Sequence, residues 1–327
     1  MTGNCSRSAY AGQSVLVTGA GGYIGSALTA ALVAAGAGVI RLSRGPLPPL
    51  AGTSDVTGDP CRAATWAGAV LEADTVFHLA GETSLYAALA DPLASLEANV
   101  LPLVHLGQAF RKAGRCPVVV AASTCTVFGL AQSLPVSDAA PPLPLSHYDT
   151  HKLMAEMQLA QDCREGFVRG CALRLANVYG LGPRSQGAPD RGILDRMVRK
   201  ALAGEAITVY GDGTHVRDYI HLDDVVTAFL AAGSCAQAWD GGALMAATGR
   251  PSTLGQAFAL VAERVAALTG APPVPLCMAP WPAGAHAAEF RNFVGMAERL
   301  RSLTGWAPAV SLTDGIDRTI RELTRTS

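Results

Sequence analysis

The chain of 327 residues is long enough for one large domain or two moderate ones, with a substantial buried core. Half of the residues are hydrophobic, only 16% are charged, and the formal net charge is −1. This composition is typical of a folded α/β protein and excludes a disordered chain. The near-zero charge provides no basic field for nucleic acid or an anionic membrane surface, so neither partner is expected.

The eight cysteines are scattered, with no CxxC pair and no histidine at the spacing of a metal site. In a chain of this length we expect reduced, mostly buried thiols and no metal. Residues 8–40 carry no charge, but glycines and polar residues interrupt them, so a strand, a turn and a helix explain the stretch. We find no targeting segment and expect a cytoplasmic location.

The N-terminal half alternates short apolar runs with helix-like segments. Continuous apolar runs predict strands that are buried on both faces. Repeated strand–helix units of this kind predict an α/β fold with a doubly wound parallel sheet. Strands are predicted at Ser14–Thr18, Val39–Leu42, Thr75–Leu79, Val118–Ala122 and Gly170–Leu175, and helices at Tyr23–Ala35, near Leu93–Ala113 and at Tyr148–Arg164.

The character of the sequence changes after Asn177. Gly and Pro gather between residues 179 and 189, an amphipathic helix follows from Ile193 to Leu202, and the Pro-rich stretch 271–284 predicts a crossing loop. We expect a dinucleotide-binding domain over residues 1–178, to which a segment near 220–248 returns. A smaller, mixed α/β substrate domain would cover residues 179–219 and 249–327.

Three glycines directly after the first predicted strand form the pattern GxxGxxG. Gly19, Gly22 and Gly25 stand in VTGAGGYIG, where a helix opens. With 35 glycines about 0.4 matches arise by chance, so the strand–turn–helix context is what makes the pattern specific. Glycines there allow a tight turn and close backbone approach, and the helix N-terminus offers N–H groups to a pyrophosphate. The turn, with Tyr23 and Ile24, is predicted to bind a dinucleotide.

The residues after the second predicted strand distinguish the two dinucleotides. An acidic side chain there typically binds the ribose hydroxyls of NAD, whereas this chain has Ser43 and Arg44. Serine and arginine can hydrogen-bond and neutralise a 2′-phosphate, so NADP(H) is favoured over NAD(H). The alternative is a solvated Arg44 that contacts no ligand. Further cofactor candidates are Asp59 near the adenine amine and Leu79, Ala80 and Gly81 as a small-residue wall.

Tyr148 and Lys152 form the pattern YxxxK, which places both side chains on one face of a helix. About 0.06 matches are expected by chance, so this pattern is more specific than the glycines. A neighbouring ammonium lowers the pKa of a phenol, and the phenolate can take a proton from a sugar hydroxyl as its carbon gives up hydride. The alternative is a surface pair. Thr124, which follows the strand before this helix, is predicted to orient the substrate oxygen, with Ser123 as second choice.

Together these residues resemble the extended short-chain dehydrogenase/reductase family, in its group of nucleotide-sugar epimerases, dehydratases and ketoreductases. The resemblance covers almost the whole chain and implies a Rossmann domain with a small substrate domain. Its segments are VTGAGGYIGS (17–26), FHLAG (77–81), DP (91–92), Asn99, STCTVFG (123–129), SHYDTHK (146–152), RLANVYGLGP (174–183), VYGDGTHVRDYIHLDDV (209–225) and LTGWAP (303–308).

The resemblance also implies roles for single residues. Thr124, Tyr148 and Lys152 would form the catalytic trio, with Tyr148, Lys152 and Asn99 also at the cofactor. Asn177 and Arg217 would hold the nucleotide diphosphate of the substrate, a role that suits a forked guanidinium. The alternative for Arg217 is a salt bridge to a nearby aspartate. Further candidates for this pocket are Tyr179 and Arg184. A homodimer is suggested by the family alone.

Three functions remain open after these assignments. Cys125 and Thr126 stand where the 4,6-dehydratases have an acidic pair, which argues against a dehydratase. We expect an epimerase that acts at sugar C4 through a 4-keto intermediate. The alternative is an NADPH-dependent 4-ketoreductase, which Ser43, Arg44 and LTGWAP favour. A distant alternative is a non-catalytic NADP-binding protein, although Tyr148 and Lys152 are both present. The sugar and the nucleotide base are left open.

Overall fold

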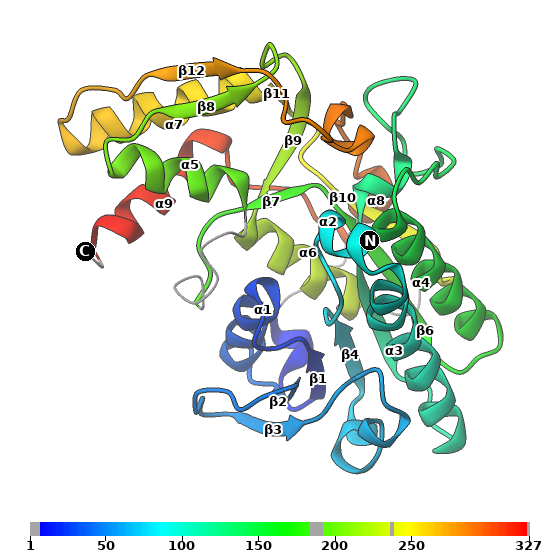
Figure 1. The fold of residues 1–327 in the computed structure, drawn as a ribbon. Helices are drawn as coiled ribbons and strands as arrows, with labels where there is room; N and C mark the ends of the chain where they lie inside the picture. The colour runs from blue at the N-terminus through cyan, green and yellow to red at the C-terminus, as the bar shows by residue number, and fades with distance from the viewer. Residues whose placement is uncertain (1–6, 184–191, 236–238, 326–327) are drawn as a thin grey trace.

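The computed structural model describes residues 7–183, 192–235 and 239–325 (Figure 1). Seven strands form one parallel sheet in the order β10-β6-β5-β4-β1-β2-β3. This arrangement confirms the doubly wound parallel sheet. The strands are β1 (Ser14–Thr18), β2 (Gly38–Ser43), β3 (Thr53–Thr57), β4 (Thr75–His78), β5 (Val118–Thr124), β6 (Arg169–Leu175) and β10 (Ala243–Ala246).

Helices cover both faces of the sheet because successive side chains of a strand point to opposite faces and both sets are apolar here. In β1, Val15 and Val17 belong to the core on one side, and Leu16 belongs to the core on the other. The first side carries α1 (Tyr23–Ala34) and α6 (Leu222–Ser234), and the second carries α2 (Leu85–Ala90), α3 (Pro92–Lys112) and α4 (His147–Arg164).

A smaller lobe, at the upper left of Figure 1, has its own apolar core between α5, α7, α9 and the strand β8. It contains a three-stranded sheet in the order β11-β9-β7 and a two-stranded parallel sheet of β12 and β8. Its elements are β7 (Asn177–Tyr179), α5 (Ile193–Leu202), β8 (Ile207–Tyr210), β9 (Val216–His221), β11 (Pro251–Thr253), α7 (Leu254–Thr269), β12 (Leu276–Ala279) and α9 (Leu312–Arg325).

Two of the strands that were not predicted, β3 and β12, show why the sequence carried no signal for them. The sequence of β3 is polar and mostly exposed, so it lacks the apolar run by which the other strands of the sheet were found. The strand β12 lies inside the stretch that was predicted to be a crossing loop, and it is likewise largely exposed. Both are held by backbone pairing with a single neighbour, β2 and β8 respectively, and this pairing leaves no hydrophobic pattern in the sequence.

The chain returns to the large sheet after its first visit to the small lobe. The helix α6 packs on α1, and β10 pairs with β6 at the edge of the sheet. A short helix, α8 (Glu298–Thr304), packs against β10. We therefore propose the domain division of residues 1–178 with 220–248 against 179–219 with 249–327, because β10 closes the sheet of the first domain.

The cysteines differ in two respects from the expectation of reduced, mostly buried thiols. Among the described residues six are free, but only Cys125 and Cys171 of these are buried, and Cys235 is disulfide-bonded. Within the described residues, none of the helices combines the length and the apolar character that a membrane crossing needs. Nor do three or more His, Cys, Asp or Glu side chains gather into a metal site in that part of the chain.

Candidate active site

The predicted cofactor residues meet where the strand order reverses. β1 has β2 on one side and β4 on the other, and ligands of doubly wound sheets bind beyond the carboxyl ends of the strands at such a point. Gly19 follows β1, Ser43 ends β2 and Leu79 follows β4. The amides of Leu79 and Ala80 both donate to the Thr18 hydroxyl at 3.1 Å, which joins the ends of β1 and β4.

The glycine turn is shaped for the close approach of a ligand. Gly19 has φ +66°, and a methyl group on it would lie 2.9 Å from the amide nitrogen of Ala80. A methyl group on Gly25 would overlap the Gly19 carbonyl oxygen. Gly22 is the N-cap of α1, and no described side chain caps that terminus. The free N–H groups and the helix dipole favour an anion there, so the turn fits the pyrophosphate of a dinucleotide.

Tyr23 and Ile24 form the first turn of the same helix. The Tyr23 hydroxyl donates to the carbonyl oxygen of Gly180, in the segment that follows β7. Ile24 packs against the core on the α1 side of the sheet. Tyr23 thus connects the glycine turn to the small lobe.

Two buried polar atoms of residues that line a small cavity with Lys152 have no hydrogen-bond partner among the described residues, namely Asn99 Oδ1 and His78 Nε2. The Thr18 hydroxyl accepts from two amides, so its own hydrogen goes to His78 Nδ1 at 2.9 Å, and the ring proton sits on Nε2. Burial lowers the pKa of His78 to about 3, which keeps the ring neutral. The unpaired acceptor of Asn99 and the Lys152 amine both lie beside Gly81, and they fit the polar end of a nicotinamide nucleotide.

The residues that were predicted to bind the adenosine end of the cofactor are less enclosed than those at the nicotinamide end. Ser43 Oγ donates to the carbonyl oxygen of Gly45 at 2.5 Å, and Arg44 is exposed. Asp59 accepts from the Cys61 amide at 3.0 Å, and its other oxygen lies 3.9 Å from Arg62, so the carboxylate is engaged within its own loop. Of these candidates, Arg44 is the one with a charged group free to meet a phosphate.

Lys152 and Tyr148 line different cavities, whereas the YxxxK pattern predicted the ammonium group of Lys152 beside the phenol of Tyr148. The Lys152 amine donates to the Ala122 carbonyl oxygen at 3.1 Å, and it lines a small cavity with His78 and Asn99. Burial lowers the pKa of Lys152 to about 8, so the amine is mostly charged at neutral pH. Burial, together with the Asp149 carboxylate, raises the pKa of Tyr148 to about 12. The expected acidification of the phenol is therefore absent in the protein alone.

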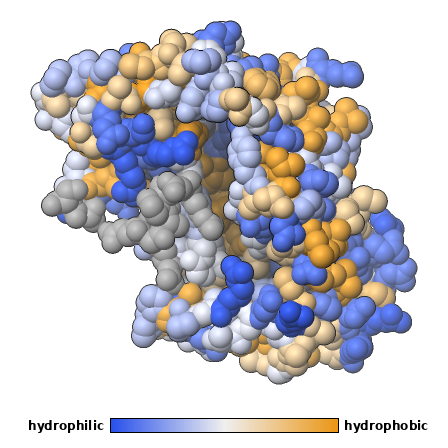
Figure 2. Space-filling view, in the orientation of Figure 1, coloured by the Kyte–Doolittle hydropathy of each residue, from blue (hydrophilic) through white to orange (hydrophobic). Residues whose placement is uncertain are grey.

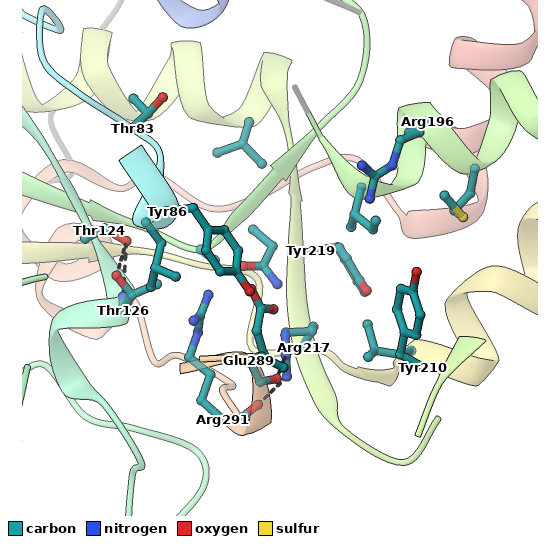
Figure 3. A pocket seen from close by; sticks show the side chains of 18 of the residues that line it. Thr83, Tyr86, Thr124, Thr126, Arg196, Tyr210, Arg217, Tyr219, Glu289 and Arg291 are labelled. Carbon is teal, nitrogen blue, oxygen red and sulfur yellow. Dashed lines mark hydrogen bonds between the residues drawn. The ribbon is translucent and has the colours of Figure 1, made fainter. Parts of the chain in front are cut away.

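Tyr148 opens instead onto a pocket of about 780 Å³ between the two lobes, within the range of small-molecule sites. Figure 2 shows the surface hollowed there, and Figure 3 shows the side chains inside. Thr124 and Tyr148 both line this pocket. Asn177 and Arg217 stand on the same lining, so the structure brings four predicted residues together in one space.

Arg217 is held in a fixed orientation in this pocket. Its side chain is 5% exposed, and its guanidinium donates to the carbonyl oxygens of Arg291, Glu289 (2.8 Å) and Val216 (3.1 Å) rather than to an aspartate. Burial lowers the pKa of Arg217 to about 10, which still leaves it charged at neutral pH. The backbone contacts orient the guanidinium without neutralising it.

Three further cations line the pocket and were not predicted: Arg196 and Lys200 on α5, and Arg291. Figure 3 labels the two arginines. In the part of the chain that the structure describes, none of these three nor Arg217 forms a salt bridge. Uncompensated cations favour a polyanionic ligand. The spacing of Arg196 and Lys200, one turn apart on an amphipathic helix, was the signal available in the sequence.

The sequence patterns also did not predict the aromatic side chains at the far end of the pocket. Tyr210 and Trp281 are stacked, with ring centroids 5.7 Å apart and planes at 28°, and Tyr219 and Phe258 line the same region. They come from β8, β9, α7 and the segment after β12. Their meeting depends on the fold of the small lobe, and no local pattern predicts it.

Two predicted substrate residues do not reach the pocket. The Ser123 hydroxyl donates to the buried Glu156 carboxylate behind the sheet, so Ser123 is not a substitute for Thr124. Tyr179 is 1% exposed and its hydroxyl donates to the Ser311 carbonyl oxygen at 3.2 Å, which makes it part of the small-lobe core. Arg184 lies outside the described residues.

Comparison with known proteins finds one family of enzymes that shares the sequence and the fold of this chain. Residues 15–242 match the model of the NAD dependent epimerase/dehydratase family. A UDP-glucose 4-epimerase of Mycolicibacterium smegmatis is 33% identical over 93% of this chain and 96% of its own. The structure of MoeE5 with UDP-glucuronic acid and NAD is 31% identical, with a TM-score of 0.81 over 96% of this chain and 100% of that one.

The UDP-glucose 4-epimerase of Thermotoga maritima, solved with UDP-glucose, is 28% identical, with a TM-score of 0.83 over 96% of this chain and 99% of that one. The likeness to these relatives extends over both lobes. It therefore includes the pocket between them as well as the cofactor domain.

Proposed function

The chain belongs to the NAD-dependent epimerase/dehydratase family, and from this premise we propose that it is a UDP-hexose 4-epimerase. The observation that carries the proposal is that one pocket is lined both by Thr124 and Tyr148 and by the cations Arg217 and Arg291. A sugar held there by its diphosphate reaches the phenol and the threonine hydroxyl together. The relatives named above include 4-epimerases with full-length coverage, whereas the ketoreductase alternative has no such relative among them.

In this proposal Tyr148, as phenolate, takes the proton from the sugar O4, and Thr124 holds the same oxygen. A bound nicotinamide dinucleotide supplies reversible hydride transfer at C4. The 4-keto sugar turns over in the pocket and receives hydrogen on its other face, while Tyr148 returns the proton to O4. Lys152, Asn99 and His78 would hold the nicotinamide end, and Gly19, Gly22 and Gly25 the pyrophosphate. Arg217, Arg291 and Asn177 would bind the diphosphate of the substrate.

The test is incubation of the purified protein with UDP-glucose, UDP-galactose or UDP-glucuronate, followed by separation of the C4 epimers. We expect interconversion of one pair without net consumption of NAD(P)H. Oxidation of NADPH in proportion to a 4-keto sugar, with no epimer formed, would instead identify a ketoreductase. Matched assays with GDP- and CDP-sugars test the base, which the proposal takes as uracil from the relatives.

We further propose that NADP(H) is preferred over NAD(H), because β2 ends without a carboxylate and Arg44 is exposed beside it. Ser43→Asp should weaken NADP(H) binding at least about tenfold and NAD(H) much less, since a carboxylate repels the 2′-phosphate. Titration of both cofactors by fluorescence measures the ratio. MoeE5 is solved with NAD, so both must be compared in the parent protein. An equal effect of Ser43→Asp on both cofactors contradicts the preference.

We also propose a homodimer formed through α3 and α4. Leu93 is 66% exposed and Met157 63%, and Figure 2 shows apolar side chains gathered over these helices. Large exposed apolar side chains on adjacent elements are typical of a subunit interface. Sedimentation at micromolar concentration should give twice the chain mass, and a monomer mass would refute this proposal. A cytoplasmic location stays a prediction.

A further inference from the structure

The pocket lining beside Tyr148 contains a carboxylate that the proposed function does not use. Asp149, the next residue of α4, lines the pocket although it is only 1% exposed. One of its oxygens accepts the hydroxyl hydrogen of Thr126, and the other accepts from the Leu145 amide at 3.4 Å, as the oxygens of an ionised carboxylate do. In the described part of the chain it forms no salt bridge. An uncompensated negative charge therefore stands next to the proposed base.

The bond to Asp149 also decides what Thr126 presents to the pocket. A hydroxyl group has one hydrogen and two lone pairs. The hydrogen of Thr126 is directed to Asp149, so only lone pairs remain for the pocket and for Thr124, whose Oγ1 lies 2.9 Å away (Figure 3). Thr126 can thus accept a hydrogen bond from a hydroxyl group of a ligand, but it cannot donate one to a carboxylate.

The charges of the pocket lining leave no cation for a second anionic group of the substrate. Among the described residues, the lining contains four cations and two carboxylates, which gives a net charge of +2: Arg196, Lys200, Arg217 and Arg291 against Asp149 and Glu289. Each phosphate of a nucleotide diphosphate carries about one negative charge, as in nucleic acid. The diphosphate alone therefore balances the lining, and a carboxylate on the sugar would be an excess anion.

The group at C6 of the sugar is the one that would meet this part of the lining. In the proposed function, Tyr148 and Thr124 hold O4. C6 is attached to C5, the neighbour of C4, so it stays close to these two residues whichever face of the ring is presented. Thr126 is the hydrogen-bonded neighbour of Thr124, and Asp149 stands directly behind it.

We propose that Asp149 is a specificity-determining residue, which selects a sugar with a neutral hydroxymethyl group at C6 and rejects a hexuronate. This inference rests on the proposed function, because it places C6 relative to O4. The buried negative charge repels a carboxylate at C6, and like charges brought together away from water are strongly unfavourable. Thr126, held as an acceptor by Asp149, suits the hydroxymethyl group. Discrimination thus combines an attractive contact for one sugar with a repulsive one for the other.

The first test compares kcat/KM of the parent protein for UDP-glucose and for UDP-glucuronate, each measured by separation of the C4 epimers. We expect the value for UDP-glucose to be higher by at least about tenfold, because the excess charge of the uronate has no partner in the pocket. An equal value, or a preference for UDP-glucuronate, would overturn the proposal. This comparison needs no variant, so it does not depend on how a substitution affects folding.

The second test is Asp149→Asn, which removes the charge and nearly keeps the side-chain shape. The ratio of kcat/KM for UDP-glucuronate to that for UDP-glucose should rise at least about tenfold over the parent ratio, since the repulsion is gone. If this variant is unstable, Asp149→Ala gives the same readout with a residue that suits a helix. A ratio that stays at the parent value contradicts the role of Asp149.

The ratio separates this role from two other effects of Asp149. The residue stands in the first turn of α4, where its amide donates to the N-cap Ser146 at 3.1 Å and an acidic side chain stabilises the helix end. Besides burial, its charge also raises the pKa of the Tyr148 phenol. Both effects act on the two substrates alike in one preparation of enzyme, so they cancel in the ratio.

Glu165→Gln is the matched control, because Glu165 is an exposed carboxylate beyond the other end of α4. It makes the same change in net charge outside the pocket, and the ratio should stay within about twofold of the parent, since exposed charges are screened. A change as large as that of Asp149→Asn would assign the discrimination to overall charge and overturn the proposal.

Failure of this inference and failure of the proposed function give different results. A parent protein that epimerises none of the UDP-sugars refutes the function itself. A parent protein that interconverts UDP-glucose and UDP-galactose, with the same substrate ratio in Asp149→Asn, leaves the function standing and removes the role of Asp149 alone.

Discussion

Tyr148→Phe should reduce epimerisation by about 10²–10⁴-fold, because it deletes the group that exchanges the O4 proton. Tyr148 lines the pocket, and a phenylalanine ring fills the same space without the hydroxyl group. The affinities for cofactor and for UDP should stay nearly unchanged, since the glycine turn and Arg217 are untouched. Steady-state rates and cofactor titration measure the two effects. A Tyr148→Phe enzyme that retains more than about a tenth of the parent rate would place the base elsewhere.

Glu156→Leu should destabilise the fold by about 3–5 kcal/mol, because it leaves the buried Arg174 charge without a partner. The Arg174 guanidinium contacts the Glu156 carboxylate at 2.7 Å, and the two side chains are 9% and 6% exposed. Ser123 donates to the same carboxylate, so its hydroxyl also loses an acceptor. Unfolding in urea measures the change in free energy.

The matched control for this loss is the double variant Glu156→Leu/Arg174→Met. Apolar replacement of both members of a buried ion pair is often close to neutral in stability, because neither charge is left desolvated. The double variant should therefore be more stable than Glu156→Leu alone. If the two variants are equally unstable, the loss in free energy of unfolding comes from altered packing rather than from an unpaired charge. Our account of this pair is then wrong.

The features that the sequence predicted well are local ones. The glycine turn depends on backbone freedom within seven residues, and Gly19 does adopt a positive φ. Five of the seven strands of the large sheet, β1, β2, β4, β5 and β6, were found because burial on both faces requires continuous apolar runs. The YxxxK pair predicted one helix correctly, but the i,i+4 rule fixes only a shared face. It does not fix what each side chain meets, and Lys152 bonds Ala122 rather than the phenol.

The features that were missed depend on contacts between distant segments. Thr126 and Asp149 are 23 residues apart, and their bond exists because the loop after β5 meets the start of α4. Tyr179 was assigned to the pocket, but Ser311, which is 132 residues away, accepts its hydroxyl in the small-lobe core. Arg196 and Arg291 meet Arg217 only through the fold of the small lobe. Residue type indicates the chemistry in such cases, and tertiary packing decides the position.

The polypeptide crosses from one lobe to the other between β6 and β7, between β9 and α6, and between β10 and β11, and it crosses again on either side of α8, which packs against β10. The Tyr23 hydroxyl joins the lobes at a further point through its hydrogen bond to Gly180. The two walls of the pocket thus come from segments that the chain links several times. The side chains of these walls set the space in which a sugar ring can turn.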